Sequence, residues 1–323
     1  MNITQRWIIA AALLLGATLA RGADAPVIKF TDTGDAPGAF PAKWICGSVS
    51  LMDNQDPPVQ VHWYNEHTAI LRENRAYNHE AVFMYLYFGN DKVLMIDQGS
   101  TARRDLWPLR DVVDKVIAEW CARNGKKDVK LICTQSHMHG DHYSGFAQFI
   151  GRPNTLLVGL SFEERMSFYG IKNHPAEQVK YDLGGRVVWV WGNPGHEVAE
   201  LAYYDTYSGF LHTGDMFYRG RCYVRDTRAW VASMGRLVKF SEDHHVSHIV
   251  NCHIEIDTKG NDYPRHIGYQ PDEPPVQMTV AMLKAAYEVG KTMRESRIYP
   301  SDGVYLYNQM DFGGTLEENP YAY

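Results

Sequence analysis

Residues 137–142 read His-Met-His-Gly-Asp-His and place three imidazoles and one carboxylate within six positions. The run directly follows a short apolar segment, residues 129–133, whose composition is typical of a strand, so the four side chains would lie on a loop that leaves the strand. Imidazole nitrogen and carboxylate oxygen are the ligands that zinc accepts in open, catalytic sites. A polar loop with surplus histidines is the alternative, but so dense a pattern favours a metal site.

Four further segments carry the same kinds of side chain in the same local setting. Each has an acid or a histidine just after a short strand-like run, where residues of functional sites are commonly positioned by a rigid scaffold. Any one of them alone is weak, because a single Asp or His at a strand end is more often structural. The four residues are Asp97, His196, Asp215 and His253.

The order of these segments resembles the five-motif signature of the metallo-β-lactamase superfamily, over roughly residues 44–260. The resemblance implies an α/β fold of the αββα type, a four-layer sandwich in which two mixed β-sheets face each other and helices cover the outside. It also implies two zinc ions, for which Mn²⁺ or Fe²⁺ could substitute. The implied ligands of the first ion are His137, His139 and His196, and those of the second are Asp141, His142 and His253.

By the same resemblance, Asp215 would bridge the two ions, and Asp97 would orient a ligand through a hydrogen bond from behind the site. True β-lactamases lack a bridging Asp at this motif, whereas glyoxalase-type thioesterases, lactonases, phosphodiesterases and ribonuclease-type members keep it. His139 stands where the flavodiiron branch has Glu, which disfavours a redox di-iron site. Residues 197–199 lack the Thr-Pro-Gly of glyoxalase-type enzymes, which disfavours a glutathione thioester.

Paired zinc ions would lower the pKa of a shared water, polarise a substrate carbonyl and so support hydrolysis without a protein nucleophile. Asp141 or Asp215 could then carry the proton to the leaving group. Tyr218 lies three positions after Asp215, where a tyrosine of acyl-homoserine-lactone lactonases points at the substrate carbonyl. The resemblance therefore suggests a donor to the oxyanion or leaving group, and an ordinary packed tyrosine is the alternative.

Weaker candidates for substrate contact lie near the motifs. His266, past the last motif, is a possible pocket residue, and His79 is interpreted as a turn histidine. Arg219 and Arg221 could bind an acidic group of the substrate, although solvated loop charges are slightly favoured. The loop 260–275 and the aromatic tail from Tyr299 could rim the pocket, but a stabilising C-terminal cap is the favoured interpretation.

The amino terminus predicts export. Arg6 precedes an apolar run that is too short for a comfortable membrane span, and small residues follow, so residues 1–22 read as a signal peptide. We therefore expect a single domain over residues 23–323, with a C-terminal helix and aromatic tail in 276–323, located in the periplasm or secreted, with no stable membrane insertion after cleavage. The five cysteines make an odd count, so at least one is unpaired unless it pairs between chains.

The net charge is −6, and no block of Lys or Arg alternates with aromatic residues, which disfavours a nucleic-acid partner. We expect a small-molecule substrate; the oligomeric state is not predicted.

Hydrophobic periodicity predicts helices at 105–124, 161–169, 227–242 and 276–296, and strands at 44–51, 59–64, 81–88, 92–97, 155–158, 187–191 and 247–252.

The resulting hypothesis is an exported binuclear zinc hydrolase in which hydroxide attacks the carbonyl of a lactone, ester or thioester. A β-lactamase-like amide hydrolase and a phosphodiesterase are alternatives, because the same metal pair suits each reaction. A non-catalytic metal-binding protein is the least favoured, since degenerate members normally lose ligands and all seven are present here.

Overall fold

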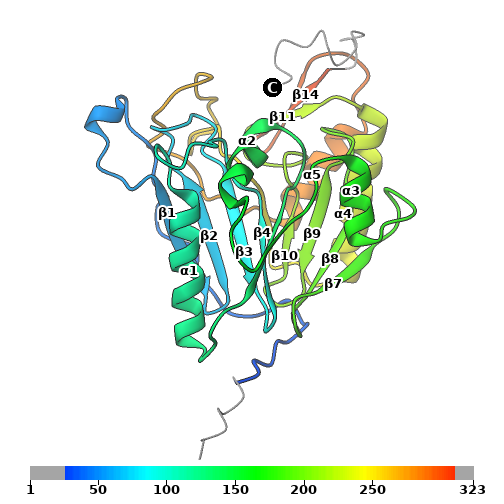
Figure 1. Cartoon of the computed structure of the whole chain (residues 1–323). Coiled ribbons are helices and arrows are strands. Elements are labelled where there is room, and N and C mark those ends of the chain that lie inside the picture. The colour runs from blue at the N-terminus through cyan, green and yellow to red at the C-terminus, as the bar shows by residue number, and fades with distance from the viewer. Residues whose placement is uncertain (1–25, 310–323) are drawn as a thin grey trace, which may run out of the picture.

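The computed structural model describes residues 26–309, which are built around two large β-sheets that face each other (Figure 1). The first sheet has six strands in the order of the chain. Strands β1 to β4 are antiparallel neighbours, whereas β4, β5 and β6 run parallel, so the sheet is mixed. Its strands are β1 (Val59–Asn65), β2 (Thr68–Glu73), β3 (Phe83–Phe88), β4 (Lys92–Ile96), β5 (Lys130–Thr134) and β6 (Thr155–Leu157).

The second sheet has five strands in the order β12-β10-β9-β8-β7. It is also mixed, because β10 and β12 are parallel while β7 to β10 are antiparallel. Its strands are β7 (Val179–Asp182), β8 (Val187–Gly192), β9 (Leu201–Asp205), β10 (Phe210–His212) and β12 (His248–Val250). A third, three-stranded sheet is formed by β11 (Arg221–Val224), β14 (Val304–Asn308) and β13 (Ile298–Ser301).

Helices cover the outer faces of the two large sheets. Helix α1 (Leu109–Arg123) packs on the first sheet, and α4 (Thr227–Asp243) and α5 (Val280–Gly290) pack on the second (Figure 1). The four-layer αββα arrangement predicted from the sequence is therefore confirmed. The short elements are η1 (Leu51–Asp53), α2 (Gly140–Tyr143), η2 (Ser144–Phe149) and α3 (Phe162–Tyr169).

Alternating side chains of the central strands separate the layers. In β3, Tyr85 and Tyr87 lie in the core between the sheets, while Met84 and Leu86 lie in the core beneath α1. In β9, Tyr203 likewise faces the core between the sheets, and its neighbours in the strand face the core beneath α4 and α5. Both faces of these strands are thus buried, which rigidly fixes the strand ends where the site is built.

Several predicted elements differ from the structure. Residues 44–51 form no strand, because Gly47 has φ 78° and makes only an isolated bridge to Tyr269. Strand β2 was not predicted, since it ends in two charged residues, Arg72 and Glu73, which are buried with partners from distant segments. Helix α5 covers only the centre of the predicted 276–296. The capping box at Ser161, which starts α3, agrees with the predicted N-cap.

All five cysteines lie within the described residues and are free, four of them buried. The predicted signal peptide, residues 1–22, and the aromatic residue Tyr321 lie outside the described residues. Over residues 26–309, no helix has the length and apolarity needed to cross a membrane.

Candidate metal centre

The five predicted motifs meet at one edge of the sandwich. Asp97 follows β4, residues 137–142 follow β5, His196 follows β8, Asp215 follows β10 and His253 follows β12. Strands β4 and β5 are parallel, as are β10 and β12, so their carboxyl ends lie at the same edge and bring distant motifs together. Three groups of side chains that could hold a metal ion result, and two of them include Asp215. The third consists of Asp97, His142 and Cys252 and lies behind the second.

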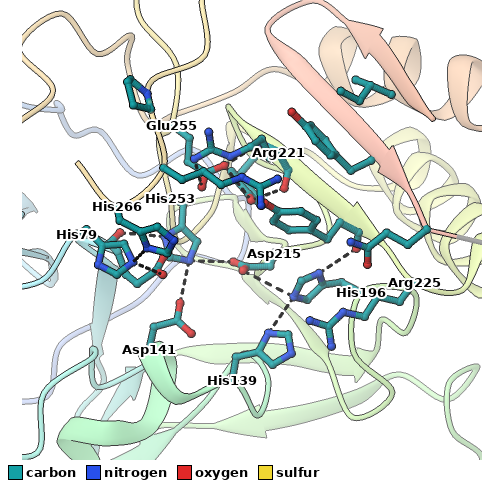
Figure 2. Close-up of a pocket in the computed structure, with 18 of the residues that line it drawn as sticks. His79, His139, Asp141, His196, Asp215, Arg221, Arg225, His253, Glu255 and His266 are labelled. Atoms are coloured by element: carbon teal, nitrogen blue, oxygen red, sulfur yellow. Dashed lines mark hydrogen bonds and ion pairs between the residues drawn. The ribbon is translucent and has the colours of Figure 1, made fainter. Parts of the chain in front are cut away.

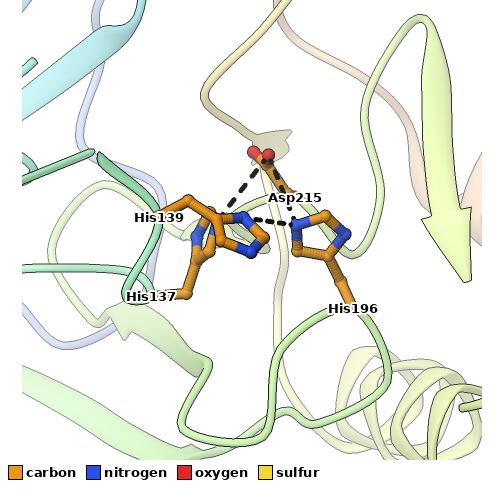
Figure 3. Close-up of side chains that lie close together, drawn as sticks. All are labelled: His137, His139, His196 and Asp215. Atoms are coloured by element: carbon orange, nitrogen blue, oxygen red, sulfur yellow. Dashed lines mark hydrogen bonds and ion pairs between the residues drawn. The ribbon is translucent and has the colours of Figure 1, made fainter. Parts of the chain in front are cut away.

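The first cluster consists of three imidazoles and the Asp215 carboxylate (Figure 3). His139 Nδ1 lies 2.8 Å from His137 Nε2 and 3.0 Å from His196 Nε2. Asp215 Oδ2 is 3.8 Å from the Nε2 atoms of both His137 and His196. Four potential ligand atoms therefore converge within 4.8 Å of one another.

The second cluster consists of Asp141, His142, His253 and the same Asp215. Asp141 Oδ2 lies 2.9 Å from His142 Nε2 and 3.2 Å from His253 Nε2. Asp215 Oδ2 is 3.6 Å from His142 Nε2, and Asp215 Oδ1 is 3.4 Å from His253 Nε2. One carboxylate thus faces both clusters, which is the arrangement expected of a bridging ligand.

The hydrogen bonds behind the histidines test whether a cation fits. The Nδ1 atom of His196 donates to the carbonyl of Tyr223 at 2.9 Å, and Nδ1 of His253 donates to the carbonyl of Glu80 at 3.0 Å. A neutral imidazole whose Nδ1 carries the proton presents a lone pair at Nε2. When the rings are neutral, both Nε2 atoms therefore aim lone pairs into the clusters, as metal-ligating histidines do.

In the second cluster the Nε2 atoms of His142 and His253 are only 3.3 Å apart. His142 Nδ1 lies 3.1 Å from the Asp97 carboxylate, so its Nε2 also presents a lone pair when the ring is neutral. Two lone pairs at this separation repel unless a cation or a proton lies between them. Asp215 Oδ1 has no hydrogen-bond partner among the described residues, so these residues fit a divalent cation.

Electrostatics favour neutral histidines in the first cluster and ionised acids in both. Burial lowers the pKa of His139 to about 3 and that of His196 to about 4, so both rings are neutral near pH 7. Burial opposes ionisation of Asp215, but the neighbouring histidines, His253 foremost, hold its pKa well below the usual range. The charge and lone-pair pattern is therefore one that attracts a divalent cation.

Asp97 holds the loop that carries the ligands. Its backbone has φ 63°, a strained conformation for a residue other than Gly. The buried carboxylate accepts hydrogen bonds from Ser136 N at 2.6 Å, from Ser136 Oγ at 2.9 Å and from the Cys252 thiol at 3.1 Å, and contacts His142. The predicted contact between Asp97 and a ligand histidine is present; Ser136 and Cys252 were not predicted.

Glu200 fixes the loop that carries Asp215 and was also missed. Its buried Oε1 atom accepts hydrogen bonds from the backbone of Asp215 at 2.8 Å and of Met216 at 3.1 Å. A Cβ at Gly214 would lie 2.3 Å from this oxygen, and Gly214 has φ 55°, so only Gly permits the close approach. The Thr-Gly-Asp order of this motif therefore has a local steric reason.

Arg165 ties two motifs together. From α3 its buried guanidinium donates to the carbonyls of Gln135 and Ser136, at 2.5 and 3.0 Å, and to that of Ala199 at 2.8 Å. The first two carbonyls precede His137, and the third follows His196. The relative position of the two loops that carry metal ligands therefore depends on the Arg165 side chain, which belongs to none of the five motifs.

The clusters lie in a cavity of about 560 Å³ (Figure 2). Its lining includes the loop residues Pro264 to His266 and the segments Ser296–Ile298 and Tyr307–Gln309. The loop 260–275 and the C-terminal strands therefore rim the pocket, and the favoured interpretation as a mere stabilising cap was wrong. The cavity is large enough for a drug-sized molecule.

Tyr218 lines the cavity, but its hydroxyl is engaged elsewhere. It donates to the carbonyl of Arg221 at 2.5 Å and lies 3.2 Å from Glu255 Oε2. Because a tyrosine has one hydroxyl proton, donation to a substrate would compete with this bond. The geometry therefore matches the alternative of a packed tyrosine better than an oxyanion donor, and a catalytic role stays a prediction.

His266 and His79 lie together at the cavity rim, their facing nitrogens 2.8 Å apart (Figure 2). His79 also contacts Glu80 Oε1 at 3.0 Å, and His266 has φ 59°. His266 is thus placed where it could touch a substrate, as predicted for a pocket residue. His79, expected to be an isolated turn histidine, joins it in the lining.

Neither of the two arginines considered for substrate binding is a solvated loop charge. Arg221 is buried and pairs with Glu255 at 2.9 Å and Asp262 at 2.7 Å, while Arg219 donates to the sulfur of Met282. Arg221 is therefore already neutralised. Arg225, which sequence reasoning did not single out, lines the cavity beside His139 and His196 (Figure 2).

A model of the metallo-beta-lactamase superfamily matches residues 78–269, more than half of the chain, and the protein belongs to this superfamily. The superfamily consists mainly of metal-dependent hydrolases, and the two clusters of His and Asp indicate divalent metal binding in this chain. No curated protein matches the sequence.

Similar solved structures include three at low sequence identity. A metallo-beta-lactamase from Pontibacter korlensis is 14% identical with a TM-score of 0.49, over 73% of this chain and 100% of that one. TMB-1 is 15% identical, with a TM-score of 0.45 over 66% and 94% of the two chains. The DIM-1 metallo-beta-lactamase exposed to ceftazidime is 14% identical, with a TM-score of 0.46 over 74% and 99%.

Proposed function

We propose that the protein is a binuclear zinc hydrolase that cleaves a lactone, ester or thioester of a small molecule. The observation that carries the proposal is the sharing of Asp215 by two ligand sets at the base of a cavity of about 560 Å³. The proposed ligands of one ion are His137, His139 and His196, those of the other are Asp141, His142 and His253, and Asp215 serves both.

Bound zinc would supply Lewis acidity and an activated water at neutral pH. The protein contributes the geometry. His196 and His253 are held in one tautomer by backbone carbonyls, and Asp97 orients His142. Asp141 and Asp215 both line the cavity, and their pKa values lie well below the usual range because the neighbouring histidines outweigh burial, so each is ionised, as a metal-ligating carboxylate must be. We assign the transfer of the proton to the leaving group to one of these two acids.

Sequence features favour a lactone or a simple ester over a β-lactam and over a glutathione thioester, and the choice between a carbonyl and a phosphoryl centre rests on the assay below. Asp215 occupies the position that β-lactamases leave without a bridging acid, and residues 197–199 depart from the glyoxalase pattern.

We also propose export through residues 1–22, which would place the substrate outside the cytoplasm. Sequencing the amino terminus of protein recovered from the periplasm or medium tests this, and an intact Met1 on cytoplasmic protein would refute it.

The reaction class is tested with a pH-indicator assay on the zinc-loaded protein across lactones, simple esters, thioesters, β-lactams and phosphodiesters. His139→Ala is the loss-of-ligand variant, and His245→Ala, on the loop after α4, is the matched control. The expected result is metal-dependent acid release from lactones, esters or thioesters that His139→Ala abolishes. Turnover confined to β-lactams or phosphodiesters would contradict the proposed bond.

A further inference from the structure

Arg225 differs from the other arginines of the described chain. Its Nε is buried without a hydrogen-bond partner, and no hydrogen bond or ion pair is formed by its guanidinium among residues 26–309. Other arginines with an unpartnered Nε, such as Arg72, Arg75 and Arg221, still donate from a terminal nitrogen. A half-buried guanidinium without partners is costly, and such a group requires a physical explanation.

The main chain of Arg225 is fixed against the metal centre. It lies between β11 and α4, and its backbone N–H donates to the carbonyl of Gly195 at 2.9 Å. Gly195 precedes the ligand His196, and a Cβ there would lie 2.5 Å from Trp230 of α4, so this junction is tightly packed. The guanidinium is therefore presented from a rigid position beside the first cluster.

The charge of Arg225 acts on that cluster. It contributes to the lowered pKa values of His139 and His196, after burial, and Figure 2 shows the guanidinium next to both rings. The acids of the cavity are engaged elsewhere. Glu255 pairs with Arg221, Glu80 contacts His79, and the two acids of the clusters face histidines. Among the described residues no acid forms an ion pair with Arg225, although Glu197, Asp215 and Glu200 attract its charge from a greater distance.

We propose that Arg225 determines substrate specificity by binding an anionic substituent, a carboxylate or a phosphate, on the molecule whose reacting bond lies at the two clusters. This inference rests on the proposed function of the same cavity and adds the charge of its substrate. A planar guanidinium suits such a group because it offers two parallel N–H donors to the paired oxygens of an anion. Arg225 is a binding residue and takes no part in the proton transfers.

Binding, measured by calorimetry on the zinc-loaded protein without turnover, tests the proposal. The probes are benzoate, phenyl phosphate and the uncharged benzamide. Arg225→Gln should weaken binding of at least one of the two anions by about tenfold to a hundredfold, the effect of losing charged hydrogen bonds, and should leave benzamide unchanged. The anion with the larger loss identifies the substituent. Arg225→Lys, which keeps the charge but not the paired donors, should fall between.

Arg228→Gln is the matched control, because Arg228 is exposed on α4 three residues away and does not line the cavity. It should bind all three probes as the unsubstituted protein does, and zinc content should be equal in all variants. Anion binding that is absent, equal in Arg225→Gln, or lost together with benzamide binding would overturn the proposal. Because the calorimetry measures binding and no reaction, it tests the role of Arg225 independently of whether the protein hydrolyses the proposed bond.

Discussion

The floor and the outer wall of the cavity are built in different ways. The floor is formed by the two clusters around Asp215. His137, His142, His196 and His253 each have a contact behind the ring, to a carbonyl or to a side chain. The outer wall is formed by residues 264–266, 296–298 and 307–309, and Ile298 in it is 47% exposed. Residues 296–309 also lie outside the superfamily match.

This difference separates two tasks. In the proposed function, the rigid floor would bind the metal and support bond cleavage, whereas the outer wall and Arg225 would contact the parts of the substrate that lie far from the reacting bond. Substitutions in the floor should therefore change metal content and rate together. Substitutions in the wall should change substrate preference and leave the metal in place.

The largest effect is expected from Asp215→Ala, which removes the carboxylate common to both clusters. Zinc content should fall for both sites, and kcat/KM should drop by at least about 10³-fold, since Lewis-acid stabilisation is worth several kcal/mol. Elemental analysis and initial rates on the same preparation measure both. A variant that keeps two zinc ions would show that Asp215 bridges nothing.

Asp97→Asn sharpens the comparison from behind the floor. The amide cannot accept the contacts of His142, Ser136 and Cys252 as the carboxylate does, so the zinc Kd should rise by about tenfold to a hundredfold. Competition with a chelator measures the affinity. Asp243→Asn, on the exposed end of α4, is the control, and equal Kd values for the two variants would remove Asp97 from the account.

Lowering the pH should release zinc from the two clusters of the floor. The acids Asp141 and Asp215 raise the pKa of His142 against the opposing effect of burial, and raise that of His253 likewise, so both rings hold protons that a metal must displace. Zinc affinity should therefore fall as pH falls, by about tenfold per pH unit for each proton displaced. Chelator competition between pH 6 and 8 measures this, and a flat profile would contradict it.

Tyr307→Ala and Ile298→Ala probe the outer wall. Both side chains line the cavity, and neither contacts a cluster residue through a hydrogen bond or ion pair. KM should rise roughly three- to tenfold, equivalent to about 1 kcal/mol of lost apolar contact, with zinc content unchanged. Loss of zinc in either variant would mean that floor and wall are not separate.

The smallest effect is expected from Tyr218→Phe, because the hydroxyl proton already serves the carbonyl of Arg221. The rate should change by less than about threefold, while the free energy of unfolding should fall by about 1 kcal/mol for the lost buried hydrogen bond. Steady-state kinetics and urea unfolding measure the two quantities. A rate loss of a hundredfold would restore the oxyanion role that the sequence resemblance suggests.

The sequence predicted the floor well and the wall poorly, for physical reasons. Residues 137–142 place several metal-ligand side chains next to one another in the sequence, so their chemistry can be recognised without the fold. The apolar strand before them places the run at the edge of a sheet. Glu200 and Arg165 act through contacts to backbone atoms of distant loops, which leave no local pattern. Arg225 is distinguished by a buried Nε and a guanidinium that forms no hydrogen bond, a combination that exists only once the chain is folded.

The central claim is that two metal ions share Asp215, and counting the metal tests it most directly. Elemental analysis of the dialysed, zinc-loaded protein, of His196→Ala and of His253→Ala should give two, one and one zinc ions per chain, because each variant damages one cluster and spares the other. A single ion in the unsubstituted protein, or unchanged zinc content in either variant, would contradict the account.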